Sequence, residues 1–461
     1  MEFKSKHFKL NYTLFCLVAL VLFFCNQVFA HVNHQNASLN NFLVITDIHL
    51  LSSTAHSMEI NPSGADVINN MDSITFPTLL QNISAGIQRG VVQKPQFIIF
   101  LGDMVGNYLG VFDSTVQIAN QKVVFTELQT KFPGIPIFYV FGNHDSTYAL
   151  NGPFYNTDQS VQYNSPYQVA QAVGWTDGFL STGTQCTAGS AFVQPCIITE
   201  STQYGYYSAY IQNKLRLIVL NTVMLMPNAI GTTTDGVNAQ FNWLTEQLKS
   251  AKYSGESVLL AMHVPFGNML QNATPINYLM SGYNDSFLAI IANYTDTIIG
   301  MVGGHEHLEE LKILTYSGVP VNFLINVASM VTYNGNASSF DTVYFTNTSG
   351  NWVITDYDAF NFLATGPTLQ QIYSFNSAYC GGLSTSILNC FQQISTQNLV
   401  NTMDLYHTAG NPNYSLAIAY PDNIFTALPT STSPNSGNGF GAAAAIIAGI
   451  AAVIGVGALM I

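Results

Sequence analysis

The sequence predicts a layered α/β fold, in which helices pack against β-sheet. Short apolar runs rich in β-branched residues recur between residues 42 and 357, and amphipathic stretches separate the earlier ones. The later runs follow one another without helices, which predicts a second sheet or the completion of the first. Of the 461 residues 48% are hydrophobic and only 8% are charged, so the chain can bury a sizeable core.

Each expected element rests on a local pattern. Apolar runs predict buried strands at residues 42–46, 97–101, 135–141, 215–220, 258–262, 298–302, 321–327, 342–346 and 352–357. Helices are expected at residues 76–88, 116–130 and 239–251. In the last of these, Phe241, Leu244 and Leu248 recur at helical spacing. The aromatic run 204–210 predicts a further strand, and residues 361–426, which lack such runs, predict a mainly helical C-terminal subdomain.

Both ends of the chain are expected to serve targeting. Residues 1–30 have lysines, an apolar run and a small-residue cleavage pattern, which indicates a secretory signal peptide. Residues 427–440 form a polar spacer, and residues 441–461 are uncharged and long enough to span a bilayer. We favour a GPI-attachment signal over a single transmembrane anchor, because no basic residue follows the apolar segment. Residues 31–360 then form the main domain.

The charge balance and the modification signals agree with an exported protein. The formal net charge of −13 argues against a surface that binds nucleic acid. Glycosylation sequons occur at Asn36, Asn82, Asn272, Asn284, Asn293, Asn336, Asn347 and Asn413. Outside the signal segment the cysteines are Cys186, Cys196, Cys380 and Cys390. Their spacing suggests disulfides within the two close pairs, although four cysteines permit three connectivities.

Metal-capable side chains gather in five short segments, each at the carboxyl end of an expected strand. The segments are ITDIH (Asp47, His49), LGDMVGN (Asp103, Asn107), FGNHD (Asn143, His144, Asp145), AMHVP (His263) and GGHEH (His305, His307). Strand ends in α/β sheets converge on one rim, where ligands bind. Two residues apart on a strand, the side chains of D-x-H and H-x-H would point to the same face. Nearby glycines would let the backbone turn sharply.

Taken together, these segments resemble the signature of the calcineurin-like metallophosphoesterase superfamily: D-x-H, G-D, G-N-H-[DE], H and G-H-x-H. The stretches GNHDSTYALNGPF, DTIIGMVGGHEHLEELKI and NVASMVTYNGNASSFDTVYF are similar to its acid sphingomyelinase-like phosphodiesterase branch. The resemblance implies a four-layer αββα sandwich with a small, mainly helical C-terminal subdomain.

The resemblance also implies roles for the motif residues. Asp47, His49 and His307 would bind a first metal ion, Asn143, His263 and His305 a second, and Asp103 would bridge the two. Members of this branch use zinc, and a metal-activated hydroxide would attack phosphorus. His144 would protonate the leaving group or stabilise the developing charge.

Two positions depart from the branch. Asn107 stands where a second active-site histidine is usual, and Asp341 stands where an arginine is usual. We expect Asn107 to contact substrate by donating a hydrogen bond, without acting as a charged acid. We expect Glu306, Glu309 and Glu310 to form a solvated face or to be partners for histidines, and His407 to be a surface or packing residue.

The expected function is therefore a secreted or surface-anchored phosphodiesterase that depends on two divalent metal ions and acts on sphingomyelin or nucleotides. Too few residues precede Asp47 for a saposin domain, which favours soluble phosphoesters, although a C-terminal tether would keep the protein at a membrane. An endopolyphosphatase-like hydrolase and a non-catalytic surface glycoprotein are the alternatives. The expected location is extracellular, at the cell surface or in the lysosomal lumen.

Overall fold

The computed structural model describes residues 40–409, except 52–69, 107–111, 159, 176–183, 188, 190, 269–276, 333–335, 363–367, 392–393 and 395. The expected signal peptide, spacer and C-terminal apolar segment lie outside the described residues, as do Asn107 and the sequons at Asn36, Asn272 and Asn413. In the part of the chain that is described, no helix has both the length and the apolar character to cross a membrane.

The described strands form two mixed sheets. The first sheet has the order β13-β12-β11-β1-β2-β3, and the second has the order β4-β5-β6-β7-β8-β10-β9. The strands are β1 (Asn40–Ile45), β2 (Phe97–Phe100), β3 (Ile137–Tyr139), β4 (Cys196–Glu200), β5 (Tyr207–Gln212), β6 (Leu215–Leu220), β7 (Ser257–Met262), β8 (Ile298–Gly303), β9 (Glu310–Tyr316), β10 (Val319–Asn326), β11 (Ser339–Thr348), β12 (Asn351–Phe362) and β13 (Leu369–Ser374). Neighbours are parallel in β1-β2-β3 and in β6-β7-β8.

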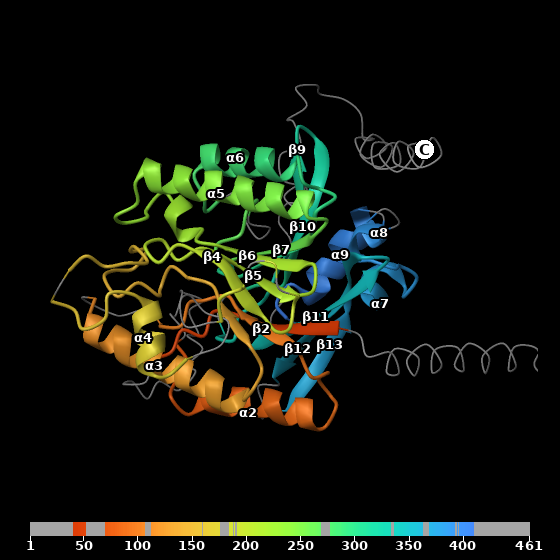
Figure 1. Ribbon diagram of the computed structural model, residues 1–461. Coiled ribbons are helices and arrows are strands. Elements are labelled where there is room, and N and C mark those ends of the chain that lie inside the picture. The colour runs from red at the N-terminus through yellow and green to blue at the C-terminus, as the bar shows by residue number, and fades with distance from the viewer. Residues whose placement is uncertain are drawn as a thin grey trace, which may run out of the picture. The chain divides into compact units, whose positions relative to one another are not determined.

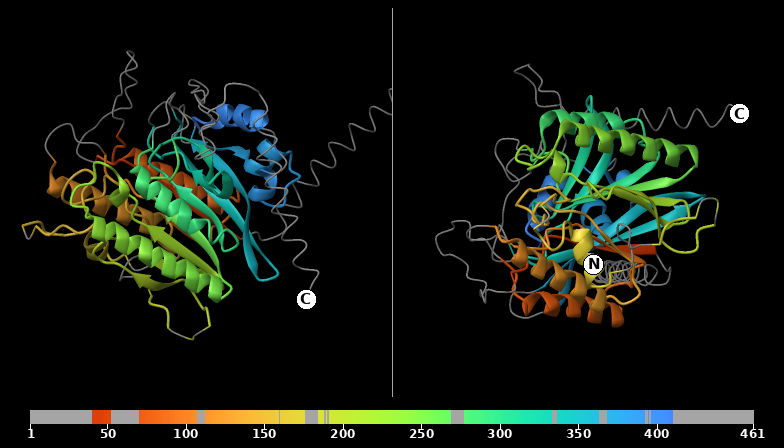
Figure 2. Two further views of the ribbon diagram at one scale, coloured as in Figure 1. Left: turned by 90° about the horizontal axis from the view of Figure 1, so that it is seen from above. Right: turned by 60° about the vertical axis from the view of Figure 1, so that its left-hand side comes forward.

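Helices cover the outer faces of the two sheets (Figure 1 and Figure 2). They are α2 (Thr75–Gln88), α3 (Ser114–Lys131), α4 (Pro166–Ala172), α5 (Thr234–Tyr253), α6 (Ser281–Ile291), α7 (Phe375–Cys380), α8 (Ile387–Phe391) and α9 (Thr396–Tyr406). Helices α2 and α3 lie on the first sheet, α5 and α6 lie on the second, and α7 to α9 form a group beside β12 and β13. The arrangement is the expected αββα sandwich.

The inner faces of the sheets form the core. Every residue of β6 and β7 is buried, and the stacked rings of Phe42 and Phe97 lie 5.0 Å apart. Two hydrogen bonds join the sheets directly: the Tyr207 hydroxyl donates to the Tyr139 carbonyl over 2.9 Å, and the Trp352 amide donates to the Ser257 hydroxyl over 3.1 Å. Burial of both faces explains why most strands are uninterrupted apolar runs.

Most sequence expectations for these elements are confirmed, with boundary differences. Helix α5 begins five residues earlier than expected, because the Thr233 side chain caps it by accepting from the Gly236 amide. Strands β4, β9 and β13 and helices α4 and α6 were not expected. Residues 369–374 pair with β12 as a strand, so the segment expected to be helical begins inside the first sheet. Its helices α7 to α9 agree with the expectation.

The cysteines pair as their spacing suggested. Cys186 is bonded to Cys196, and Cys380 is bonded to Cys390. Among the described sequons, Asn293 and Asn347 are exposed and Asn82 is half-buried. Asn284 and Asn336 are buried, and the Asn336 amide donates to Ser329 and Val331, so a glycan there would require this loop to rearrange.

Candidate metal centre

The motif residues follow the carboxyl ends of parallel strands in both sheets. Asp47 and His49 come after β1, Asp103 after β2, and Asn143 and His144 after β3. In the second sheet, His263 comes after β7, and His305 and His307 come after β8. Because neighbouring parallel strands end at the same edge, each sheet brings its own loops to one rim.

These side chains converge on two carboxylates. His307 Nε2 lies 3.2 Å from Asp47 Oδ1, and His263 Nε2 lies 3.2 Å from Asp103 Oδ2. His49 lies between the carboxylates, with its Nε2 3.4 Å from Asp103 Oδ2 and 3.7 Å from Asp47 Oδ1. The two carboxylates are therefore linked through one imidazole.

The potential ligand atoms fall into overlapping groups. In each group the ligand atoms lie within 4.8 Å of one another. The first group is Asp47, His49 and His307, the second is His49, Asp103 and His144, and the third is Asp103, His263 and His305. Asp103 and His49 each belong to two of these groups, so Asp103 lies close to histidines from both sheets, His49 from the first and His263 and His305 from the second. The amide oxygen of Asn143 lies 3.0 Å from His263 Nε2. The structure thus brings together all seven residues expected to bind metal.

The backbone at these residues has an uncommon conformation. Asp47, His49, Asp103, His305 and His307 have φ between 50° and 72°, the left-handed region that disfavours residues with a Cβ. Such strain clusters at functional sites. It also corrects one expectation: Asp47 and His49 lie beyond the end of β1, so left-handed turns, and not a shared strand face, bring their side chains together.

Two glycines permit the close approach of the loops. A Cβ at Gly142 would lie 2.3 Å from the backbone nitrogen of Asp103. A Cβ at Gly304 would lie 2.2 Å from the Thr46 hydroxyl and 2.8 Å from Asp47 Oδ2. Only glycine fits at either position, as the sequence suggested.

Asp145 fixes the loop that carries Asp103. Its carboxylate accepts hydrogen bonds from the backbone amides of Asp103, Met104 and Gly142 and from the Tyr139 hydroxyl, over 2.7–3.0 Å. His263 is oriented in the same way, because its Nδ1 lies 2.7 Å from the Leu101 carbonyl, which leaves Nε2 to face Asp103. The sequence placed Asp145 among the metal-capable residues and indicated no role for it.

Burial and mutual charge shift the pKa values across the centre. Burial would raise the pKa of Asp47, but His307 and His263 hold it well below its usual value. Burial would lower the pKa of His49, yet Asp103 and Asp47 raise it to about 9, and the same carboxylates raise the pKa of His263 to about 9. Burial lowers the pKa of His144 and of His305 to about 3. Perturbed pairs of this kind mark functional sites.

The donor set fits divalent metal ions. Asp47 Oδ1 and His49 Nε2 are buried and make no hydrogen bond within the described residues. Imidazole, carboxylate and amide donors without a thiolate suit zinc and related first-row ions. Buried, unsatisfied ligand atoms directed at one another are the arrangement that bound cations would satisfy.

Other sequence expectations have different outcomes. Asn107 lies outside the described residues, so its expected contact with substrate stays a prediction. The expectation of a solvated acidic face is wrong, because Glu306, Glu309 and Glu310 are at most 2% exposed. Glu310 instead partners His407 over 2.7 Å, which makes His407 a buried packing residue.

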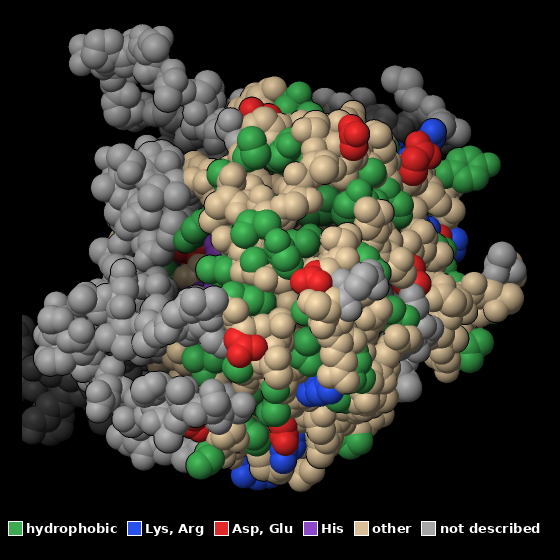
Figure 3. Space-filling model, turned by 90° about the vertical axis from the view of Figure 1, so that its left-hand side faces the viewer, with side chains coloured by type: hydrophobic (Ala, Val, Ile, Leu, Met, Phe, Trp, Pro, Cys, Tyr) green, Lys and Arg blue, Asp and Glu red, His purple; other side chains and the backbone are tan. Residues whose placement is uncertain are grey.

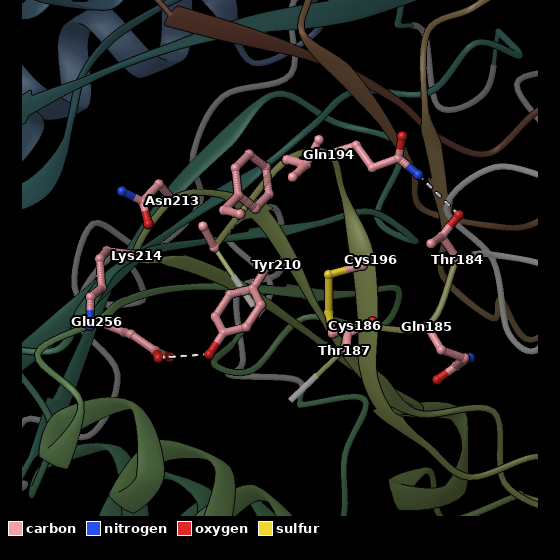
Figure 4. Close-up of a pocket in the computed structure, with 13 residues that line it drawn as sticks. Thr184, Gln185, Cys186, Thr187, Gln194, Cys196, Tyr210, Asn213, Lys214 and Glu256 are labelled. Atoms are coloured by element: carbon pink, nitrogen blue, oxygen red, sulfur yellow. Dashed lines mark hydrogen bonds between the residues drawn. A yellow bond between two sulfur atoms is a disulfide. The ribbon is translucent and has the colours of Figure 1, made fainter. Parts of the chain in front are cut away.

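A separate cavity of about 510 Å³ lies away from this centre (Figure 4). It is lined by the Cys186–Cys196 disulfide, Tyr210, Lys214 and Glu256, among others. Lys214 and Glu256 precede β6 and β7, so the cavity lies at the opposite end of the second sheet from His263. Figure 3 shows histidine side chains, coloured purple, in a hollow of the face that it presents.

Comparison with known proteins agrees with this geometry. Residues 41–309 match the family model described as calcineurin-like phosphoesterase. The chain belongs to this family. The match contains all seven of the residues that converge on the centre and both halves of the parallel strand pattern.

The relatives that this chain resembles are named as phosphodiesterases. It is 30% identical over 246 residues to cyclic GMP-AMP phosphodiesterase SMPDL3A of Bos taurus, covering 52% of the chain and 49% of the relative. The chain is 22% identical over 268 residues to sphingomyelin phosphodiesterase A of Dictyostelium discoideum, a match that covers 57% of the chain and 41% of the relative. It is 22% identical over 434 residues to sphingomyelinase phosphodiesterase D of the same organism, a match that covers 83% of the chain and 88% of the relative. The chain spans about half the length of the SMPDL3A relative. These similarities support the acid sphingomyelinase-like branch.

Proposed function

We propose that the chain is a metal-dependent phosphodiesterase of the acid sphingomyelinase-like type. The observation that carries the proposal is the convergence of Asp47, His49, Asp103, Asn143, His263, His305 and His307 on one centre, with Asp103 shared between two groups. Two divalent cations, most simply zinc, would supply a nucleophilic water and neutralise charge on the phosphoryl oxygens.

The chain's residues would have two kinds of role: some would hold the cations, and others orient the residues that hold them. Asp47, His49 and His307 would hold one cation and Asn143, His263 and His305 the other, with Asp103 between them. Asp145 and the Leu101 carbonyl hold Asp103 and His263 in place before substrate arrives. Such preorganisation lowers the reorganisation needed in the transition state.

We infer that His144 acts on the substrate. Its Nε2 lies 4.0 Å from Asp103 Oδ2, and its ring centroid lies 4.6 Å from that of His49. Because burial lowers its pKa to about 3, the imidazole is neutral near neutral pH. We therefore favour hydrogen-bond donation to the charge developing on the phosphoryl group over proton transfer to the leaving group.

Substrate, location and partners extend the same proposal. Nucleotide and sphingolipid phosphoesters are the two substrate classes, because the named relatives include a cyclic dinucleotide phosphodiesterase and sphingomyelin phosphodiesterases. We also propose that the protein is exported through the secretory pathway, that its exposed sequons are glycosylated, and that its C-terminal segment contacts a membrane. The alternatives remain a polyphosphate hydrolase and a non-catalytic surface glycoprotein.

The test is hydrolysis by the purified full chain of sphingomyelin, cyclic GMP-AMP, ATP, polyphosphate and bis(p-nitrophenyl) phosphate, with and without added zinc. The control is the double variant Asp103→Ala/His263→Ala. We expect hydrolysis of bis(p-nitrophenyl) phosphate that chelation and the double variant both abolish, and the preferred natural substrate then identifies the class. Bound metal without turnover of any substrate would contradict the proposed activity and favour the non-catalytic surface glycoprotein.

A further inference from the structure

Helix α3 presents amide side chains to the loop that carries Asn143 and His144. The Gln117 side chain donates to the carbonyl of His144, and the Gln121 side chain donates to the carbonyl of Asp145 over 2.7 Å. The two glutamines lie one helical turn apart, on the same side of the helix. They therefore hold two consecutive peptide groups of the loop.

The burial of these glutamines is unusual for a helix. Gln117 is 1% exposed and Gln121 is not exposed, and both lie on the face that continues as Val124, Phe125 and Leu128. The buried face of α3 is thus polar at its beginning and apolar toward its end. Burying an amide is unfavourable unless it is hydrogen-bonded, and the side-chain NH2 groups of both glutamines find their acceptors in the carbonyl groups of the loop.

The other side of the loop is anchored to the metal ligands. The His144 amide donates to Asp103 Oδ1 over 2.8 Å, and the Asp145 carboxylate accepts from the Asp103 amide over 3.0 Å. The loop is consequently fixed between Asp103 on one side and the glutamines of α3 on the other. Its peptide orientation determines where the His144 side chain points.

From this geometry we propose that Gln117 and Gln121 are positioning residues for His144. Their hydrogen bonds to the loop go to the backbone carbonyls of His144 and Asp145, so they act by fixing the backbone that carries the imidazole. This inference rests on the proposed phosphodiesterase function. Loss of either amide is expected to misplace His144 in the transition state and to leave substrate affinity nearly unchanged.

The test compares Gln117→Met and Gln121→Met, which keep side-chain length and remove the donor, with Gln129→Met. Gln129 is the control on the same helix. Its side chain is exposed and donates to the Gly174 carbonyl over 3.0 Å, so Gln129→Met removes a hydrogen bond from the helix to the backbone that does not hold the His144 loop. We expect kcat on bis(p-nitrophenyl) phosphate to fall about 10- to 100-fold in the first two variants, with KM within about twofold and bound zinc unchanged. The control should match the parent.

A double-mutant cycle with His144→Ala identifies the route of the effect. If Gln117 acts through His144, Gln117→Met should change kcat by less than about twofold once His144 is absent. Additive losses in that background, or an equal loss of bound zinc, would overturn the inference.

Hydrogen exchange separates failure of this inference from failure of the proposed function. Backbone amides of residues 142–146 should exchange faster in Gln117→Met and Gln121→Met than in Gln129→Met, whether or not the parent is active. Unchanged exchange would overturn the inference. A parent without hydrolytic activity would overturn the proposed function while leaving this measurement interpretable. Gln121→Asn, which keeps the amide and shortens its reach, provides a milder variant with the same expected direction if the Met variants do not fold.

Discussion

At the scale of single residues, the metal centre is built from strained backbone. A residue with a Cβ in the left-handed region costs about 1–2 kcal/mol, and His305, at φ 72°, is the furthest into it of the proposed ligands. This strain persists because the packed loops hold it, and it directs the imidazole into the centre.

The positive φ of His305 predicts that a glycine variant is more stable than an alanine variant at this position. In metal-free protein, His305→Gly should have a higher free energy of unfolding than His305→Ala, by about 1 kcal/mol, because glycine tolerates positive φ. At His144, which is not among the residues with positive φ, the order should be reversed. Urea unfolding of the four variants measures this, and the same order at both positions would contradict the strain assignment.

A second residue-scale prediction concerns Asp341, at the position where the resemblance would lead us to expect an arginine. Its side chain is fully buried, neither carboxylate oxygen has a hydrogen-bond partner in the described part of the chain, and burial together with the charges of Glu309 and Asp358 raises its pKa well above the usual value. Folding therefore takes up a proton between about pH 4 and the raised pKa, so stability falls as pH rises through that window.

Replacing Asp341 should weaken this pH dependence. Asp341→Asn removes the titrating group, so its free energy of unfolding should fall less than that of the parent between about pH 4 and about pH 8. The difference in free energy of unfolding in favour of the variant should be largest at the alkaline end of this range. Urea unfolding across that range measures it, with Glu246→Gln on the exposed surface of α5 as the control. A parallel offset at every pH would show that Asp341 does not titrate in this window.

At the scale of elements, strand β9 joins the metal loop to the C-terminal helices. Lys312 Nζ lies 2.5 Å from Glu306 and 3.5 Å from Glu310, and all three side chains are fully buried. Glu310 also contacts His407, which follows α9, while the Glu309 amide donates to the His407 carbonyl over 3.0 Å. The cluster fixes His407, which follows α9, against the segment that carries His305 and His307.

Removing the lysine should be strongly destabilising. Burial and the charge of Glu310 raise the pKa of Glu306, so Glu310 is the buried carboxylate that depends on the Lys312 charge. Lys312→Met removes that charge, and the free energy of unfolding should fall by about 3–5 kcal/mol. Lys252→Met, which breaks the exposed pair with Asp296, should cost less than about 1 kcal/mol. Comparable losses in both variants, measured by urea unfolding, would indicate that the buried cluster adds little.

At the scale of the whole molecule, the proposed cations would connect the two sheets. Asp47, Asp103 and Asn143 follow strands of the first sheet, whereas His263, His305 and His307 follow strands of the second. Ions bound between these loops would stabilise the folded state, because the unfolded chain does not hold the ligands together.

Metal removal should therefore lower thermal stability. Zinc at about a hundredfold excess over its Kd should add about 2.7 kcal/mol per bound ion to the free energy of unfolding, and chelation should remove it. Asp103→Ala should lose most of this gain, since it removes a residue shared by two ligand groups. Calorimetry with and without chelator measures it, and an identical Tm in both conditions would contradict a cation between the sheets.

The sequence by itself determined the layered fold, most strands and the residues that converge on the centre, whereas for the disulfides it only suggested the pairing that the structure shows. These follow from local rules: periodicity identifies the strands, and polar residues after parallel strands must meet at one rim. Helix α3 also contained a readable signal, because Gln117, Asn120 and Gln121 interrupt the face that would otherwise enter the core.

Only the tertiary structure decided how those residues are held. Left-handed turns bring Asp47 and His49 together, and the Asp145 carboxylate and the glutamines of α3 fix loops far away in the sequence. The acidic residues after His305 are buried because β9 enters the second sheet and His407 returns to it. Each of these depends on contacts between segments far apart in the chain, and no local pattern encodes which distant group will satisfy a buried charge.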